Sequence, residues 1–219
     1  MLNIYIASQS HYLEPFKDLF QEVWNIKGAD VVMFTGGADV SPRLYNEPVG
    51  QYTSTNWNRD QNELEIFEFA VDHGIKMLGI CRGSQFLTVM AGGKLVQDVT
   101  DHGRSHAIYS IECPELDELD KPFDYINGQS VIMSSTHHQM MHPYNLDEQD
   151  YDILAYARHR SKHYLNGHNQ PIPHSGIEPE IVWYQKIKAL AIQGHPEIMD
   201  FNSSGVQYCR SLIKEYFNV

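Results

Sequence analysis

Cys81 is the residue whose setting most favours chemistry. It lies in the stretch GICRGSQ, where an apolar run ends and a helical pattern begins. Gly79 and Gly83 leave room for a sharp strand-to-helix turn, the geometry of a nucleophile elbow. Such a turn lifts the sulfur out of the sheet and places it at a helix N-terminus, where unpaired backbone N–H groups and the helix dipole favour the thiolate. The pattern therefore predicts a nucleophilic cysteine.

A general base for this cysteine is provided by the stretch AIQGHPE near the C-terminus. His195 and Glu197 follow the end of an apolar run and are two positions apart. In an extended chain, side chains two positions apart leave on the same side. Glu197 can thus hold the imidazole of His195 in the tautomer that faces the sulfur. We predict a catalytic triad of Cys81, His195 and Glu197.

Two adjacent glycines are positioned to stabilise the negative charge that forms when a carbonyl is attacked. Gly36 and Gly37 follow the apolar run at residues 29–34. If that strand lies beside the strand before Cys81, their amides can join the backbone N–H of Arg82 to form an oxyanion hole. Each motif alone is a weak signal, but all three come at the ends of apolar runs, as expected of one site.

Strands and helices alternate through the first half of the chain. Continuous apolar runs predict strands that are buried on both faces, and helical periodicity predicts the segments between them. The helix at residues 59–74 has the clearest ends, with Asp60 as the cap, Glu63 three residues later and Gly74 after its last turn. The predicted order is strand 2–7, helix 12–26, strand 29–34, helix 59–74, strand 75–80 and helix 83–91.

The second half contains mostly predicted strands, followed by one helix. No internal repeat or linker-like composition divides the chain. We therefore predict a single α/β domain over residues 1–219, with a mostly parallel central sheet flanked by helices. The predicted elements are strands at 105–113, 130–139 and 152–158, a hairpin at 180–185 and 189–193, and a helix at 203–217.

Composition and charge exclude several classes of protein. Hydrophobic residues make up 42% of the chain and charged residues 20%, which is typical of a globular protein. No apolar run approaches the roughly 20 residues of a membrane span, and the N-terminus does not resemble a signal peptide, so we expect a cytoplasmic protein with no membrane partner. The formal charge of −12 disfavours nucleic acid as a partner. Three cysteines without a CxxC motif indicate neither a disulfide framework nor a thiolate metal site.

The sequence resembles the class I glutamine amidotransferase-like family, which has a flavodoxin-like fold and a Cys-His-Glu triad. Within this family it is most similar to the gamma-glutamyl hydrolase branch, which includes gamma-glutamyl-gamma-aminobutyrate hydrolases. The resemblance covers residues 29–215, nearly the whole chain. The matching stretches are GGADVSPRLY, RDQNELE, GICRGSQFLTVMAGGKLVQD, STHHQ and AIQGHPE.

The resemblance implies hydrolysis of a gamma-glutamyl amide through a gamma-glutamyl thioester, with release of glutamate and an amine or ammonia. In that mechanism Cys81 attacks the side-chain carbonyl, and His195 passes a proton to the departing nitrogen before water releases glutamate. The resemblance also implies a set of residues that bind the substrate. They are Gln85, His137, His138 and Gln139 at the glutamyl backbone, and Asp39 and Tyr45 at the rim around the leaving group.

Two functions remain open at this point. The protein is either a free-standing hydrolase of a small gamma-glutamyl amine or the glutaminase subunit of an amidotransferase that delivers ammonia to a synthase partner. The sequence contains no P-loop or other ATP-binding motif, so the second function requires a separate protein. Enzymes of this size often form symmetric homodimers, which the sequence neither requires nor excludes.

Twelve histidines raise the question of a metal site. The densest group lies in a turn-rich segment and has no acidic or thiol ligand at a fixed spacing, which is typical of a solvated loop. We therefore expect no metal and no cofactor. The group comprises His159, His163, His168 and His174.

Three further features give weaker signals. His137 and His138 are neighbours, so on a strand they should face opposite ways, with one toward the pocket and the other packed or in solvent. The acidic run at residues 112–121 is expected to be a solvated face. Cys113 and Cys209 are expected to pack as small apolar side chains.

Overall fold

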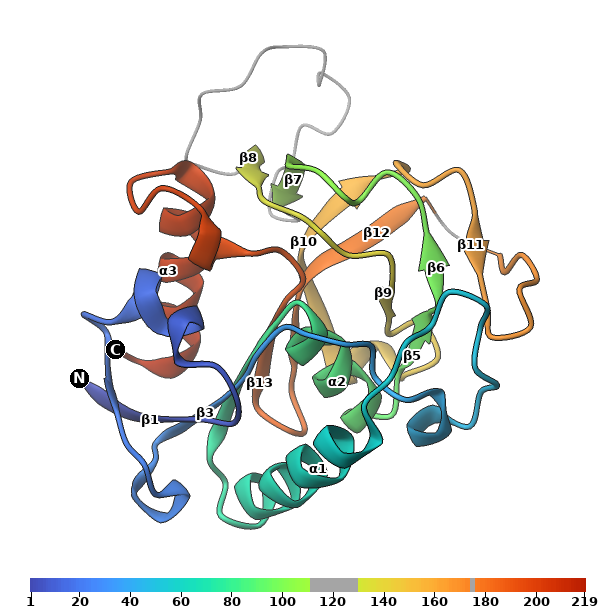
Figure 1. Cartoon of the computed structure of the whole chain (residues 1–219). Coiled ribbons are helices and arrows are strands. Elements are labelled where there is room, and N and C mark those ends of the chain that lie inside the picture. Colours follow the sequence, from blue (N-terminus) through green and yellow to red (C-terminus); the bar gives the residue numbers. More distant parts are fainter. Residues whose placement is uncertain (111–129, 174–175) are drawn as a thin grey trace.

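The computed structural model describes residues 1–110, 130–173 and 176–219 and is built around a nine-stranded mixed sheet (Figure 1). The strands of this sheet are β1 (Leu2–Ile6), β2 (Phe20–Glu22), β3 (Val31–Phe34), β4 (Lys76–Ile80), β7 (His106–Ser110), β8 (Ser130–Met133), β10 (Tyr151–Arg158), β12 (Ile177–Tyr184) and β13 (Ala189–Ile192). Their spatial order is β2-β1-β3-β4-β13-β12-β10-β7-β8. Two small sheets pair β5 (Lys94–Val96) with β9 (Met140–His142) and β6 (Asp98–Val99) with β11 (Tyr164–Leu165).

The large sheet has a parallel half and an antiparallel half. β1 pairs in parallel with β2 and β3, β3 with β4, and β4 with β13. From β13 the sheet continues antiparallel through β12, β10, β7 and β8. The predicted α/β fold and the hairpin formed by β12 and β13 are confirmed. The parallel half positions the site, because the carboxyl ends of β3, β4 and β13 lie side by side, where sheets of this kind bind ligands.

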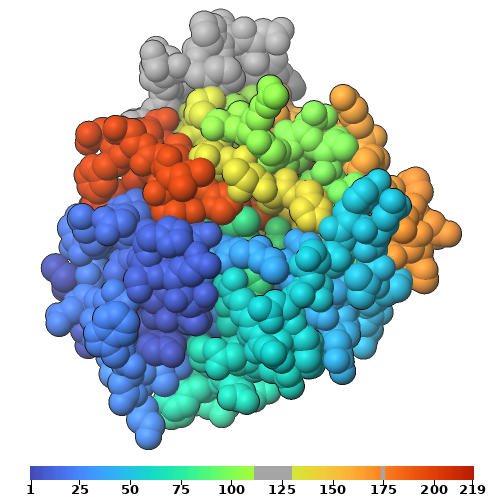
Figure 2. Space-filling view, in the orientation of Figure 1, coloured from blue at the N-terminus to red at the C-terminus, as the bar shows by residue number. Residues whose placement is uncertain are grey.

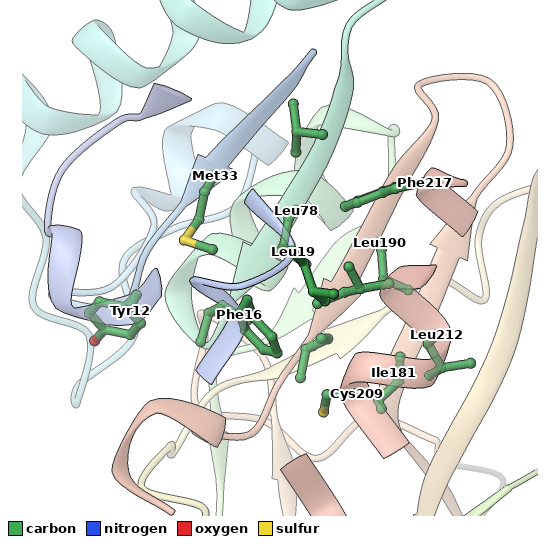
Figure 3. Packing of buried hydrophobic residues seen from close by; sticks show 14 of the residues in the cluster. Tyr12, Phe16, Leu19, Met33, Leu78, Ile181, Leu190, Cys209, Leu212 and Phe217 are labelled. Atoms are coloured by element: carbon green, nitrogen blue, oxygen red, sulfur yellow. The ribbon is translucent and has the colours of Figure 1, made fainter. Parts of the chain in front are cut away.

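Helices cover both faces of the sheet. Alternate residues of β3 enter two different cores: Val31 and Met33 pack in the cluster that includes α3, and Val32 and Phe34 pack in the cluster that includes α1 and α2. Figure 3 shows the first cluster, which Phe217 joins from the last helix. None of the helices in the described residues is long and apolar enough to cross a membrane. The helices are α1 (Trp57–Asp72), α2 (Arg82–Met90) and α3 (Ser204–Phe217), with 3-10 segments η1 (Ser10–Phe16), η2 (Ile26–Gly28), η3 (Pro42–Tyr45), η4 (Glu148–Asp150) and η5 (Pro196–Ile198).

The predicted helix at residues 12–26 is wrong. This segment forms η1, then β2, and then leads into η2. Pro15 lies inside η1 and has no N–H to give to a helical ladder. Phe16 and Phe20 are buried in the core, and β2 pairs with β1 at the edge of the sheet. Burial and strand pairing therefore outweigh the helical periodicity of this segment, as tertiary context often does.

The predicted helix at residues 59–74 is present as α1, but its cap differs. The N-cap is Asn56, whose side chain accepts a hydrogen bond from the Arg59 amide at 3.2 Å. Asp60 was predicted to be the cap and is instead fully buried one turn inside the helix. A buried carboxylate needs a partner, and the partner of Asp60 is Arg82 of α2.

The strands of the antiparallel half have other bounds than predicted, and β10 and β12 begin earlier. The strand expected at residues 130–139 ends at Met133 as β8, and residues 134–139 leave the sheet. The strand expected at residues 105–113 corresponds to β7, which the structure describes over His106–Ser110. Positions beyond it, including Cys113 and the acidic run, lie outside the described residues, as does His174.

The beginning and the end of the chain pack together (Figure 2). Arg210 of α3 donates hydrogen bonds to Asp18 Oδ1 at 2.7 Å and Oδ2 at 2.6 Å, and to the Pro15 carbonyl at 2.6 Å. In Figure 2 the N-terminal residues, in blue, lie directly beside the C-terminal residues, in red. The segment that replaces the expected helix is therefore fixed by α3.

Gly83→Ala should destabilise the protein strongly. A Cβ at Gly83 would lie 2.1 Å from the backbone carbonyl oxygen of Phe34, which cannot move without disturbing β3. We expect the free energy of unfolding, measured by urea denaturation, to fall by about 3 kcal/mol. Gly28→Ala is the matched control, because a Cβ there meets no atom within 4 Å, and it should change stability by less than about 0.5 kcal/mol. Equal effects of the two substitutions would contradict this account of the helix–sheet contact.

Candidate active site

The turn predicted at Cys81 is present, and close contacts of two glycines hold it. Cys81 lies between β4 and α2 with φ 52° and ψ −109°, a conformation that costs a non-glycine residue on the order of 1–3 kcal/mol. A Cβ at Gly79 would lie 2.5 Å from the Gly83 carbonyl oxygen, and one at Gly83 would meet the Phe34 carbonyl oxygen at 2.1 Å. The cysteine is therefore at the N-terminus of α2 because the missing side chains let helix and sheet approach closely.

His195 and Glu197 follow β13 and lie next to this turn. His195 Nδ1 donates a hydrogen bond to Glu197 Oε1 at 2.6 Å, and Cys81 lies close enough to the His195 ring to raise its pKa. Since Nδ1 faces Glu197, the contact with Cys81 uses Nε2. Burial by itself lowers the pKa of His195, but the interactions with Cys81 and Glu197 outweigh burial and raise this pKa to about 10. The three side chains form one connected series.

Thr136 also contacts the histidine, and sequence analysis assigned it no role. Its Oγ1 lies 2.8 Å from His195 Nε2, so that Nε2 is shared between Cys81 and Thr136. The backbone N–H of His195 donates to the Ser134 carbonyl at 2.9 Å. The segment after β8 therefore holds the imidazole through both backbone and side chain. A single threonine beside two histidines gives no signal of this role, because only the fold brings it to His195.

Tyr12 is a second residue of the site that sequence analysis missed. Its ring centroid is 6.3 Å from that of His195, and a Cβ at Gly36 would lie 2.2 Å from its hydroxyl oxygen. Burial raises the pKa of Tyr12 to about 12, with smaller contributions from the nearby Glu197 and Cys81, so the side chain is a neutral phenol at ordinary pH. The predicted helix at residues 12–26 gave no indication of this contact, because the contact depends on the 3-10 segment η1 that contains Tyr12.

Arg59 of α1 orients the glycine loop that was predicted to hold an oxyanion. Its guanidinium donates to the Gly36 and Thr35 carbonyls, both at 2.8 Å. The peptide bonds of the described chain are trans, and in a trans peptide the N–H points opposite to the C=O. The amides of Gly36 and Gly37 therefore point away from Arg59. A Cβ at Gly37, whose φ is 144°, would lie 2.1 Å from the Arg59 guanidinium.

The side chain of Arg82 is buried beneath the turn. It forms ion pairs with Asp60 and Glu63 of α1, and the Ser41 amide donates to Asp60 at 3.2 Å. Arg59 binds the same Glu63 at 2.8 Å. Breaking a buried pair of this kind leaves an uncompensated charge, so the network holds α1 and α2 in a single register. The stretch RDQNELE thus supplies the carboxylates that fix the residue after Cys81.

The residues that the family resemblance assigns to the substrate have different surroundings. Gln85 and Gln139 are buried, and Gln85 Nε2 donates to the Gln139 carbonyl at 3.0 Å. His138 is partly exposed, and its Nε2 lies 3.2 Å from Asp39 Oδ1. The hydrogen bond to Asp39 raises the pKa of His138. Substrate contact by these four residues stays a prediction.

His137 and Tyr45 are the other two residues assigned to the substrate, and both are buried. His137 Nδ1 donates to the Gln139 carbonyl at 2.9 Å, and its Nε2 lies 3.8 Å from Glu180 Oε1. His137 is buried and His138 partly exposed, but neither lies on a strand, so the expectation based on strand geometry does not apply to them. The Tyr45 hydroxyl has no hydrogen-bond partner among the described residues.

The histidine-rich loop is engaged in other contacts. His163 Nε2 lies 2.6 Å from Asp98 Oδ2, and His159 Nδ1 lies 3.3 Å from the Tyr164 hydroxyl. Within the described ranges, the residues whose ligand atoms are close enough to share a metal lie elsewhere, at His102, His106 and Glu180.

Solved structures with similar folds share the α/β architecture. A glutamine amidotransferase from Thermotoga maritima matches with a TM-score of 0.54 and 14% identity over 99% of this chain and 82% of that chain. The glutaminase domain of CTPS from Trypanosoma brucei, solved with bound acivicin, matches with a TM-score of 0.57 and 12% identity over 97% of this chain and 93% of that chain. At this identity the likeness shows the fold alone.

Sequence comparisons identify the family. The glutamine amidotransferase-like protein YvdE of Lactococcus lactis is 31% identical over 157 residues, which is 60% of this chain and 66% of YvdE, just under two thirds. NtpR of Enterococcus hirae is 38% identical over 74 residues, which is 33% of this chain and 31% of NtpR. The model of the peptidase C26 family matches residues 17–160, a range that includes Cys81 and ends before His195. The chain therefore belongs to the peptidase C26 family, and its fold is that of the class I glutamine amidotransferases.

Proposed function

We propose that this protein hydrolyses a gamma-glutamyl amide through a thioester on Cys81. The observation that carries the proposal is the connected series of Cys81, His195 and Glu197 at the N-terminus of α2. Membership of the peptidase C26 family and similarity to glutamine amidotransferase-like proteins support the same class of substrate.

The proposed reaction has two steps. The sulfur of Cys81 attacks the side-chain carbonyl carbon of the gamma-glutamyl group, the C–N bond breaks, and His195 gives its Nε2 proton to the departing nitrogen. Water then attacks the thioester, with His195 taking one proton from it, and the C–S bond breaks to release glutamate. The backbone amides of Gly36, Gly37 and Arg82 stabilise the tetrahedral oxyanion in both steps. The amide of Gly36 also contacts the Tyr12 hydroxyl.

The remaining residues position these groups. Glu197 holds the imidazole through Nδ1, and Thr136 steadies the ring at Nε2. The ion pairs of Arg82 with α1 hold the backbone amide that faces the oxyanion. We assign the glutamyl backbone to Gln85, His138 and Gln139, and the rim to Asp39 and Tyr45, as the family resemblance implies. The resemblance also implies His137, but we leave it out because its two ring nitrogens face the Gln139 carbonyl and Glu180.

A glutaminase subunit is the second candidate. The structural neighbours include PurLQS from Thermotoga maritima, with a TM-score of 0.56, and the CTPS glutaminase domain. On this alternative the thioester chemistry is the same, but the substrate is glutamine and the ammonia passes to a synthase partner.

Cys81→Ala should abolish turnover and leave the fold intact. The nucleophile is lost, so glutamate release should fall by about 10⁴-fold or more, while the urea midpoint should stay near that of the wild type. Cys209→Ala is the control: this buried thiol lies in α3 and is not a member of the proposed triad, so the variant should lose about 1 kcal/mol of stability and keep most of its rate. Wild-type turnover by Cys81→Ala would refute the assignment of the nucleophile.

The stability of the protein should depend on His195 between neutral and alkaline pH. The folded pKa of about 10 lies above the ordinary value of 6.5. The protonated ring therefore stabilises the fold fully below pH 6.5, and this contribution is lost as the pH rises through 10. We expect the difference in unfolding free energy between wild type and His195→Gln, measured by urea denaturation, to shrink over this range. A difference that stays constant with pH would show that His195 is not a protonated member of the series.

The substrate test is a panel of glutamine and gamma-glutamyl amines incubated with the purified protein while glutamate release is followed. Steady turnover of a gamma-glutamyl amine identifies a free-standing hydrolase. Slow turnover of glutamine alone, increased by a synthase, identifies a glutaminase subunit. If no member of the panel yields glutamate or a thioester adduct on Cys81 by mass spectrometry, the proposed function is wrong.

A further inference from the structure

Five titratable side chains gather in a buried cluster outside the series of Cys81, His195 and Glu197. The cluster draws on the loop after β6, on β7, on the segment after β8 and on β12. All five side chains are at most 1% exposed. Buried groups of this type normally neutralise one another or bind a metal. The members are His102, His106, His137, Glu178 and Glu180.

Each histidine of the cluster has one ring nitrogen committed to a hydrogen-bond acceptor. His102 Nε2 donates to Glu178 Oε2 at 3.1 Å. His106 Nδ1 donates to the Arg104 carbonyl at 3.1 Å. His137 Nδ1 donates to the Gln139 carbonyl at 2.9 Å. A metal-binding histidine characteristically gives its other N–H to a carboxylate or a backbone carbonyl, as these three do.

The second ring nitrogens of all three histidines face one oxygen atom. Glu180 Oε1 lies 2.9 Å from His106 Nε2, 3.3 Å from His102 Nδ1 and 3.8 Å from His137 Nε2. His102 Nδ1, His137 Nε2 and Glu180 Oε2 are buried and have no hydrogen-bond partner among the described residues.

This arrangement favours a positive charge among the rings, either as added protons or as a metal ion. A neutral imidazole has one N–H, which each ring already donates, so a lone pair of each would face a carboxylate oxygen that has only lone pairs. Protonation of His102 and His106 would balance the charges of Glu178 and Glu180, but it would leave the buried His137 Nε2 without a hydrogen-bond partner in the described part of the chain. A divalent cation would bind the lone pairs of all these nitrogen and oxygen atoms at once.

We propose that His102, His106 and Glu180 bind a zinc-type divalent metal ion, with His137 Nε2 as the nearest further donor. The ligand atoms of the three residues all lie within 4.8 Å of one another. Zinc bonds of about 2.0–2.1 Å in a tetrahedral site place ligand atoms about 3.3 Å apart, close to the spacing around Glu180 Oε1. Glu178 accepts a hydrogen bond from His102 Nε2 and thereby orients the His102 ring toward the metal.

The proposed metal would join the antiparallel half of the sheet to residues 134–139, which we call the catalytic segment because Thr136 contacts His195. It would connect β7 and β12 to residues 134–139, which carry Thr136 and Gln139. Thr136 binds His195, and the Gln139 carbonyl accepts from both His137 and Gln85 of α2. The role we assign to the ion is structural, because each of its protein donors is buried and none belongs to the proposed triad.

The first experiment measures metal in the full chain, purified without a metal-affinity tag and dialysed in the absence of chelator. We expect close to one equivalent of zinc per chain by elemental analysis. Replacement by Co²⁺ should give the intense visible absorption of a tetrahedral site, and a strong chelator should lower the melting temperature. A wild-type chain that holds no metal and gives no cobalt spectrum would overturn the proposal.

Three variants locate the site. Glu180→Gln should abolish the cobalt spectrum, since it removes the central anionic ligand. Glu178→Gln should weaken metal affinity by about 10–100-fold, as loss of a supporting carboxylate does. His168→Gln is the matched control, because this histidine is exposed in the loop, and it should bind as the wild type does.

The metal content and the cobalt spectrum of the wild-type protein test the proposal even if a variant fails to fold. Loss of the cobalt spectrum in His168→Gln, or its full retention in folded Glu180→Gln, would place the metal elsewhere and refute the proposed site. Because these measurements use no substrate, their failure leaves the proposed hydrolase function untouched. A metal-loaded protein that releases no glutamate would refute that function alone.

Discussion

The close approach of α2 to β3 is the constraint on which the site depends. Gly83 lies against the backbone of Phe34 with no room for a Cβ, and Gly79 lies against Gly83 in the same way. This contact lets α2 begin directly after β4, and it forces Cys81 into a left-handed backbone conformation. The sulfur therefore meets the end of β13, which pairs with β4 and delivers His195. Backbone strain at one residue is stable here because the packing around it leaves no alternative.

Networks of buried charged groups also fix the geometry of the site. Arg82 follows the strained residue, and its guanidinium is enclosed by Asp60 and Glu63 of α1. Taking charges out of water is costly, so such a network contributes more to fixing a geometry than to net stability. The histidine cluster around Glu180 has the same character on the other side of the catalytic segment. Two buried polar networks thus hold the nucleophile turn and the segment that contacts the base.

Sequence reasoning succeeded where a signal is local and failed where it is not. The glycines around Cys81 and the pair His195 and Glu197 are local signals, so both could be found in the sequence. The extended chain assumed for the pair is wrong, because Glu197 lies in the 3-10 segment η5. Tyr12 was assigned to a helix because its segment has helical periodicity, yet the segment divides into η1, which contains Tyr12, and β2, which pairs with β1. Thr136 carried no signal, because its contact with His195 joins segments 59 residues apart.

The sequence by itself determined the alternation of strands and helices over residues 29–91, the strained turn and the pair of residues after β13, since each follows from local sterics and apolar patterning. Only the tertiary structure decided that half of the sheet is antiparallel, that Asp60 binds Arg82 instead of capping α1, and that three histidines converge on Glu180. These features depend on which distant segments become neighbours. Burial then selects the partners, because a charged or polar group removed from water must find one wherever the fold supplies it.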